Sequence, residues 1–153
     1  MDIVVVSDTH GHTGFIEKLV QKHPNAYMYL HAGDSCLRQE ELYPFETVKG
    51  NCDYYINNRI KLVNIYGVKI LMFHGDGFIL DLDMLVNYAK NYDAQIIIHG
   101  HTHIPYVNYV DGVHIVCPGS VYLPRVTGPT YALIHINNAD DIKVEIVNYE
   151  NRQ

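Results

Sequence analysis

An excess of positive charge is the first thing this sequence lacks. The chain has 11 lysines and arginines against 17 aspartates and glutamates, and a formal net charge of -6 with histidine neutral. Proteins that bind nucleic acids use basic surfaces to neutralise phosphates. A nucleic-acid duplex is therefore excluded from the expected partners.

Long apolar runs are also missing. No stretch approaches the roughly 20 apolar residues that cross a bilayer, and no charged-then-apolar leader stands at the N-terminus. We therefore expect neither export nor a membrane partner, and the predicted location is the cytoplasm.

Cysteine is scarce. The 3 cysteines, Cys36, Cys52 and Cys117, are scattered, odd in number and form no CxxC pair. This pattern excludes a zinc knuckle and favours free thiols in a reducing compartment.

Repeats, linkers and low-complexity segments are absent as well. A chain of 153 residues, with 48% hydrophobic and 18% charged residues, has the length and composition of one compact domain. We predict a single domain over residues 1–153.

Short apolar runs separated by turn signals fill most of the chain. Early runs over residues 2–7, 26–31 and 45–49 predict strands, with a helix after Thr13 that ends at Pro24 and a short helical piece over 38–42. Later runs predict antiparallel strands on either side of the turns Tyr66-Gly67 and Asp111-Gly112, and a helix that begins at Asp81 or Asp83. This order predicts an α/β (α+β) fold, a four-layer α/β/β/α sandwich of two packed mixed sheets with helices outside.

Polar residues with metal-ligating side chains follow the ends of these runs. In open sheets, ligands collect beyond the carboxyl ends of the strands. Asp8 and His10 are two residues apart, and in an extended segment their side chains would share a face, as would those of His101 and His103. The mixed nitrogen and oxygen donors suit Mn²⁺, Fe²⁺ or Zn²⁺ better than Ca²⁺. The predicted metal ligands are Asp8, His10, Asp34, Asn51, His74, His101 and His103.

Five motifs in order resemble those of the calcineurin-like metallophosphoesterase superfamily. They are Asp8-x-His10, Gly33-Asp34, Gly50-Asn51-x-Asp53, His74-Gly75 and Gly100-His101-x-His103. Further downstream, Pro118-Gly119-Ser120 and Leu123-Pro124-Arg125 resemble the small bacterial and archaeal phosphodiesterase branch of that superfamily. The resemblance implies that Asp8, His10, Asp34 and His103 hold one cation, and that Asp34, Asn51, His74 and His101 hold the other.

The same resemblance implies a dinuclear phosphodiesterase. Two divalent metal ions per chain, with Mn²⁺ as the first choice and Fe, Ni or Zn as alternatives, would be bridged by Asp34 and by a hydroxide that attacks the phosphorus. Two divalent cations, less two carboxylates and the hydroxide, leave a positive centre that a phosphodiester monoanion would neutralise. The expected partner is a small phosphodiester substrate, and the oligomeric state stays open, with a homo-oligomer as one outcome.

Two positions depart from the family pattern. Many members have histidine after the Gly-Asn pair, where this chain has Cys52, either a proton donor of a different kind or a small residue packed under the metals. Relatives often have another histidine after His74-Gly75, where this chain has Asp76. Asp76 can orient His74 or His101, form a simple Gly-Asp-Gly turn, or donate the proton to the leaving oxygen. We predict catalytic roles for Asp34, Asn51, Asp76 and Cys52.

Other function classes stay open at this stage. One is a catalytically weak metal-binding scaffold similar to the retromer subunit of the same fold, although that subunit has degraded metal motifs and this chain keeps all of its predicted ligands. A metal-dependent regulatory module is a further alternative. A phosphomonoesterase is disfavoured, because the sequence shows no cluster of extra cations to receive a dianion.

Overall fold

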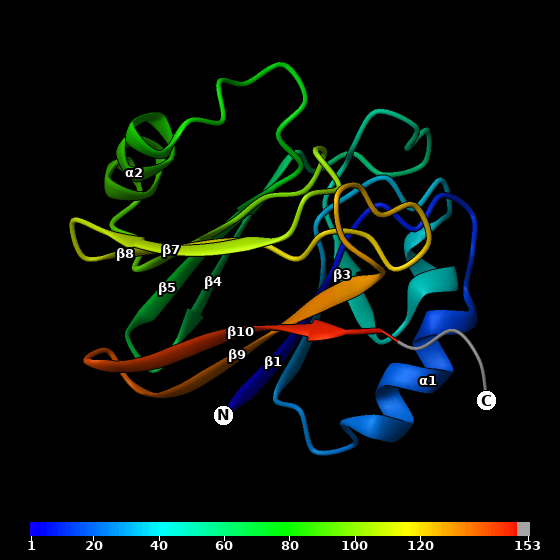
Figure 1. Cartoon of the computed structure of the whole chain (residues 1–153), viewed down its shortest axis with the longest axis horizontal. Coiled ribbons are helices and arrows are strands. Elements are labelled where there is room, and N and C mark those ends of the chain that lie inside the picture. The colour runs from blue at the N-terminus through cyan, green and yellow to red at the C-terminus, as the bar shows by residue number, and fades with distance from the viewer. Residues whose placement is uncertain (150–153) are drawn as a thin grey trace.

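Two five-stranded sheets packed face to face form the centre of the molecule (Figure 1). The computed structural model describes residues 1–149, and residues 150–153 of the predicted domain lie outside the described residues. Both sheets are mixed, so parallel and antiparallel pairs occur in each.

The first sheet has the strand order β10-β9-β1-β2-β3. Its central strand β1 carries the most apolar run of the N-terminus, which is buried on both faces as expected for an interior strand. On one side of β1, β2 pairs in parallel with β1 and β3 in parallel with β2. On the other side, β9 pairs antiparallel with β1, and β10 pairs antiparallel with β9. The bounds are β1 Asp2–Val6, β2 Met28–His31, β3 Phe45–Thr47, β9 Thr130–Asn138 and β10 Asp141–Asn148.

The second sheet has the order β4-β5-β6-β8-β7 and contains both predicted hairpins. At each turn the two central residues have positive φ, 48° and 89° at Tyr66 and Gly67 and 51° and 81° at Asp111 and Gly112, which joins adjacent antiparallel strands tightly. The bounds are β4 Ile60–Ile65, β5 Val68–Phe73, β6 Ile96–Ile98, β7 Tyr106–Val110 and β8 Val113–Cys117.

The helices cover the outer faces of the two sheets, as Figure 1 shows. Helix α1 (Gly14–Lys22) buries Phe15 and Leu19 against the first sheet, and helix α2 (Leu82–Asn91) buries Leu85 against the second. A short 3₁₀ helix, η1 (Gln39–Leu42), precedes β3. The predicted four-layer α/β/β/α sandwich is confirmed. Within residues 1–149, no helix combines the length and apolarity needed to cross a membrane.

Alternation along β1 explains how one strand serves two hydrophobic layers. Ile3 and Val5 point between the sheets, where they join Ile70 and other side chains of the second sheet. Val4 and Val6 point the other way and pack with the apolar face of α1. Each such fully buried side chain contributes about 1.5–3 kcal/mol relative to exposure, so the ends of β1 are held rigidly.

The start of α2 is set by Asp81, which resolves the alternative between Asp81 and Asp83. Asp81 is the N-cap, and its carboxylate accepts a hydrogen bond of 2.8 Å from the backbone N–H of Met84. We expect Asp81→Ala to lower the free energy of unfolding by about 0.5–2 kcal/mol, measured by urea denaturation. Asp83→Ala, which removes a carboxylate from the first turn but no cap, is the matched control. An equal loss in both variants would contradict the assignment of the cap.

Candidate metal centre

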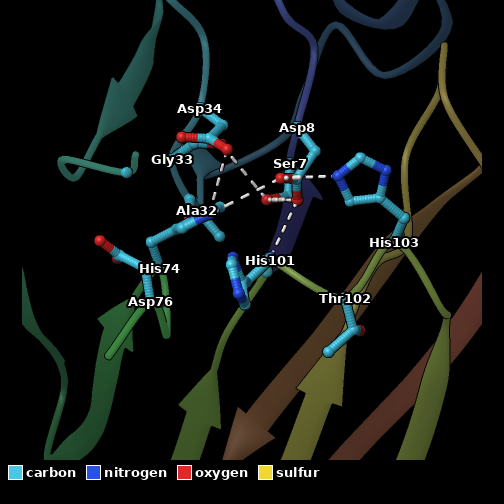
Figure 2. Close-up of polar contacts among 12 residues, drawn as sticks. Ser7, Asp8, Ala32, Gly33, Asp34, His74, Asp76, His101, Thr102 and His103 are labelled. Atoms are coloured by element: carbon cyan, nitrogen blue, oxygen red, sulfur yellow. Dashed lines mark hydrogen bonds and ion pairs between the residues drawn. The ribbon is translucent and has the colours of Figure 1, made fainter. Parts of the chain in front are cut away.

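The predicted ligands come from loops at the ends of strands in both sheets. Asp8 follows β1, Asp34 follows β2, and His74 follows β5, while His101 and His103 lie beyond β6. Figure 2 shows these five residues grouped around a common space at the strand ends. The expectation that polar residues after separate strands converge at one edge is confirmed for these residues.

Five side chains approach one another through atoms that can bind a cation. His74 Nε2 lies 3.7 Å from Asp8 Oδ1 and 3.3 Å from Asp34 Oδ2. His103 Nε2 lies 3.2 Å from Asp8 Oδ1. His10 Nε2 lies 3.9 Å from both Asp8 Oδ1 and Asp34 Oδ2. Two groups result, each with ligand atoms within 4.8 Å of one another: Asp8, His10 and His103, and Asp8, Asp34 and His74.

Three of these atoms are buried without a hydrogen-bond partner in the described part of the chain. They are Asp8 Oδ1, His10 Nε2 and His74 Nε2. An unpartnered buried polar atom costs about 1–3 kcal/mol, and native proteins rarely leave several of them in one place. A cation bound between the carboxylate and the imidazoles would satisfy all three atoms, so the residues present fit a metal.

Neighbouring groups fix the orientation of the candidate ligands. His74 Nδ1 donates to the carbonyl oxygen of Ala32 at 2.8 Å, and His103 Nδ1 donates to that of Leu123 at 2.7 Å. Each imidazole therefore turns Nε2 into the site, and a bound cation would take the place of a proton on that nitrogen. Asp8 is arranged in the same way, because Ser7 Oγ donates to its Oδ2 at 2.6 Å and leaves Oδ1 free.

The electrostatics of the site favour positive charge. Burial lowers the pKa of His74, but its close contact with Asp34 and the charges of Asp8 and Asp34 outweigh it and raise that pKa to about 9. Burial raises the pKa of Asp34, yet the close contact with His74 and the charge of His74 lower it to about 2. The pKa of His103 is raised, chiefly by its close contact with Asp8. The carboxylates of Asp8 and Asp34 thus place negative charge in the site, and a bound cation can balance that charge.

Asp8 and His10, and likewise His101 and His103, are brought together by left-handed backbone and not by the alternation of side chains along a strand. The φ angles are 57° at Asp8, 45° at His10, 74° at His101 and 63° at His103, and Asp34 is also left-handed at 64°. The expectation of extended segments is therefore wrong. Side-chain-bearing residues adopt this region at a cost, and such residues gather at functional sites.

Two glycines allow the loops to approach closely. A Cβ at Gly100 would overlap Ser7 Oγ and come within 2.9 Å of Asp8 Oδ2. A Cβ at Gly50 would overlap Asp34 Oδ1 and come within 2.6 Å of Asp34 N. Gly50 thus brings the loop after β3 against Asp34, and the predicted ligand Asn51, which is exposed, is the next residue.

Asp53 ties the loop after β2 to the loop after β3, a role that sequence reasoning missed. Its buried carboxylate accepts hydrogen bonds from the backbone N–H groups of Asp34 at 2.8 Å, Cys36 at 2.8 Å and Gly50 at 2.7 Å. In the sequence, only its place in the motif Gly50-Asn51-x-Asp53 pointed to a role for Asp53. Ser120, whose Oγ donates to the carbonyl oxygen of Asp8 at 2.8 Å, was similarly visible only as part of a motif.

The structure gives Asp76 a different partner from the expected one. Arg59 Nη2 lies 3.4 Å from Asp76 Oδ1 and donates to the Asp76 carbonyl oxygen at 3.0 Å. The hydrogen bond from His74 Nδ1 goes to the Ala32 carbonyl oxygen, and the orientation of His74 or His101 by Asp76 stays a prediction. The catalytic role of Asp76 stays a prediction.

The prediction of free thiols is wrong for two of the three cysteines. Cys36 and Cys52 form a disulfide between the loops that follow β2 and β3, whereas Cys117 is free and buried. The physical reason is that Asp53 and Gly50 pack these loops together and place the two sulfurs side by side. In the disulfide, Cys52 has no thiol proton to give to a leaving group.

The sequence profile of the calcineurin-like phosphoesterase superfamily domain matches residues 1–139 of this chain. The chain therefore belongs to the calcineurin-like metallophosphoesterase superfamily, and the resemblance seen in its motifs is confirmed. Membership of this family implies binding of divalent metal ions, which agrees with the Asp and His groups described above.

Individual relatives support the same assignment. The probable metallophosphoesterase YsnB of Bacillus subtilis is 32% identical over 145 residues, which cover 90% of this chain and 86% of YsnB. A predicted phosphoesterase from Streptococcus pneumoniae superposes with a TM-score of 0.83 at 28% identity, covering 96% of this chain and 88% of that one. Vps29 of Entamoeba histolytica, in a complex with Zn²⁺, gives a TM-score of 0.76 at 25% identity, with coverage of 96% and 98%.

His31 holds the loop that carries Asp34 and must stay neutral to do so. Its Nδ1 accepts a hydrogen bond of 3.0 Å from the Gly33 N–H, and its Nε2 lies 2.9 Å from Thr9 Oγ1. Burial lowers the pKa of His31 from 6.5 to about 4. The unfolded chain therefore binds an extra proton between these values, and stability that is complete above pH 6.5 is lost as the pH falls towards 4.

We expect the stability gap between wild type and His31→Gln to narrow as the pH falls from 6.5 to 4.5. The change is at most about 1.4 kcal/mol per pH unit, measured by urea denaturation at each pH. His135 is the control, because hydrogen bonds to Asp2 and Glu145 raise its pKa. Its contribution to stability is complete below pH 6.5, so the gap for His135→Gln should stay nearly constant from pH 6.5 to 4.5 and narrow only as the pH rises above 6.5. Parallel stability curves for wild type and His31→Gln would contradict this account.

Proposed function

We propose that this protein is a metal-dependent phosphodiesterase that acts on small phosphodiesters with two divalent cations, and that residues 1–153 form its single domain. The observation that carries the proposal is the set of buried, unpartnered atoms Asp8 Oδ1, His10 Nε2 and His74 Nε2 beside the carboxylate of Asp34. Carboxylates and neutral imidazoles in this arrangement bind catalytic transition metals.

The ligands would divide into two overlapping sets. The family resemblance makes Asp34 the shared residue, and its Oδ2 lies 3.9 Å from His10 Nε2 and 3.3 Å from His74 Nε2. Asp8 Oδ1 also lies within 4 Å of both imidazoles. When bound, the cations supply the Lewis acidity that activates a water as the nucleophile and neutralises the phosphate. One set is Asp8, His10, Asp34 and His103, and the other is Asp34, Asn51, His74 and His101.

The choice of cation follows from the donor atoms. Mixed imidazole and carboxylate sites accept Mn²⁺, Fe²⁺, Ni²⁺ and Zn²⁺, and cellular supply decides among them as much as affinity does. The complex of Entamoeba Vps29 with Zn²⁺ supports metal binding in this fold. We propose Mn²⁺ as the working ion.

Charge favours a diester over a monoester. Two divalent cations are offset by the carboxylates of Asp8 and Asp34 and by the activated water, which leaves a centre suited to a monoanion. Arg59 is paired with Asp76 and so does not add free positive charge for a dianion. Arg125 lies near enough to His103 for its charge to oppose the raised pKa of that histidine, and it can contact one phosphate oxygen.

The direct test is hydrolysis of bis(4-nitrophenyl) phosphate by metal-stripped protein to which Mn²⁺, Fe²⁺, Ni²⁺ or Zn²⁺ is returned. We expect activity that depends on added metal, is highest with Mn²⁺ and exceeds that on 4-nitrophenyl phosphate. Asp34→Asn should lower kcat/KM at least about 100-fold, which corresponds to about 2.7 kcal/mol. Asp140→Asn, at an exposed carboxylate in the β9–β10 turn, is the matched control.

Inactivity with every metal, in protein shown to hold two ions per chain, would overturn the phosphodiesterase and favour the metal-binding scaffold. A higher kcat/KM on the monoester than on the diester would favour the phosphomonoesterase.

Asp76 is tested through the leaving group. If Asp76 protonates the departing oxygen, Asp76→Asn should slow hydrolysis of a diester with an alkyl alkoxide leaving group by about 100-fold or more. Hydrolysis of the nitrophenyl diester should change far less, because nitrophenolate leaves without a proton. Asp83→Asn, an exposed carboxylate in α2, is the control. Equal losses on both substrates would mean that Asp76 only holds Arg59.

A further inference from the structure

The side chain of His10 faces two different sets of ligand atoms. Its Nε2 points to the carboxylates, 3.9 Å from both Asp8 Oδ1 and Asp34 Oδ2. Its Nδ1 lies 4.0 Å from Cys36 Sγ. His10, Cys36 and Cys52 together form a group in which one ligand atom from each lies within 4.8 Å of the others. The proposed metal centre involves His10 through Nε2 but involves neither cysteine sulfur.

The backbones of both cysteines are held by hydrogen bonds that do not involve the disulfide. Cys36 N donates to Asp53 Oδ1 at 2.8 Å, and Cys52 N donates to Asp34 Oδ1 at 3.0 Å. Both cysteines are half-buried, so a reductant can reach them. These hydrogen bonds would keep the backbones of both cysteines beside His10 after the bond between the sulfurs is broken.

We propose that reduction of the Cys36–Cys52 disulfide creates a separate metal site in which both sulfurs and His10 Nδ1 bind a thiophilic divalent cation of the Zn²⁺ class. A dithiol supplies the two electrons and two protons that convert the disulfide into two thiols, and the dithiol becomes a disulfide. Each cysteine sulfur then releases its proton to solvent as it binds the cation.

The chemistry of the three atoms suits zinc, and the two sulfurs, which are bonded to each other in the disulfide, would move apart to ligand spacing once that bond is reduced. With Zn–S distances of about 2.3 Å and Zn–N distances of about 2.0–2.1 Å, neighbouring ligands on a tetrahedron stand about 3.5–3.8 Å apart, close to the spacing of His10 Nδ1 and Cys36 Sγ. Water completes the tetrahedron. Thiolate ligands select Zn²⁺ over Mn²⁺, so the two kinds of site take different ions.

The new site would compete with the metal centre for His10. A neutral imidazole has one nitrogen with a lone pair and one N–H, so it binds a cation through Nδ1 or through Nε2. Filling the cysteine site therefore withdraws His10 from Asp8 and Asp34. We therefore expect lower hydrolysis in reduced, zinc-loaded protein, and this consequence rests on the proposed function. The existence of the cysteine site does not rest on it.

The test is a Co²⁺ titration of oxidised protein and of protein reduced with a dithiol that is then removed anaerobically. We expect the reduced protein alone to develop the near-ultraviolet thiolate-to-cobalt charge-transfer absorption, saturating at one such ion per chain. The double variant Cys36→Ser/Cys52→Ser should lose this absorption. Cys117→Ser should keep it, because Cys117 is not part of the group that His10 forms with Cys36 and Cys52, and its buried sulfur contacts Thr102.

Circular dichroism verifies that each protein is folded. The absence of the absorption in folded, reduced wild type would overturn the site, as would equal absorption in the oxidised protein or in the double variant. Cobalt bound by carboxylates and imidazoles gives no thiolate absorption, and the titration involves no hydrolysis. The titration therefore tests the cysteine site alone, and the hydrolysis assay tests the proposed phosphodiesterase.

Discussion

Two carboxylates buried in one small space are the constraint on which the rest of this structure depends. Asp8 and Asp34 have relative exposures of 0% and 5%, and both lie within 4 Å of the imidazole of His74. Buried like charges are costly unless positive charge balances them. His74, whose pKa rises to about 9 because its carboxylate contacts outweigh burial, provides part of that balance. A pair of cations would provide it completely, and the unpartnered atoms around them are already in place.

The fold meets this constraint by combining rigid strands with strained loops. Apolar side chains on both faces of β1 fix the strand that ends at Asp8, and the second sheet brings His74, His101 and His103 to the same edge. Left-handed backbone at the ligand residues, the missing side chain at Gly100 and the buried carboxylate of Asp53 then bring the loops within contact distance. The hydrophobic core thus offsets the cost of a strained, charged site.

Much of this arrangement was predictable because local patterns carry it. The apolar, β-branched runs identified β1, β2 and β3 within a few residues, and the turns at Tyr66-Gly67 and Asp111-Gly112 fixed two hairpins. Ligands placed after strands converged because strand ends share an edge. The disulfide was missed because Cys36 and Cys52, with a sequence separation of 16, meet only through the contact of two loops. The pairing of Arg59 with Asp76 has no signal in local sequence either.

The central claim is that two cations bind beside Asp34, one of them also held by Asp8. Anomalous diffraction at the manganese absorption edge, from crystals grown with Mn²⁺, tests it most directly. The account predicts two anomalous peaks about 3.5–4 Å apart, with the Asp34 carboxylate in contact with both. A single peak, or peaks away from the Asp8 and Asp34 carboxylates, would contradict it.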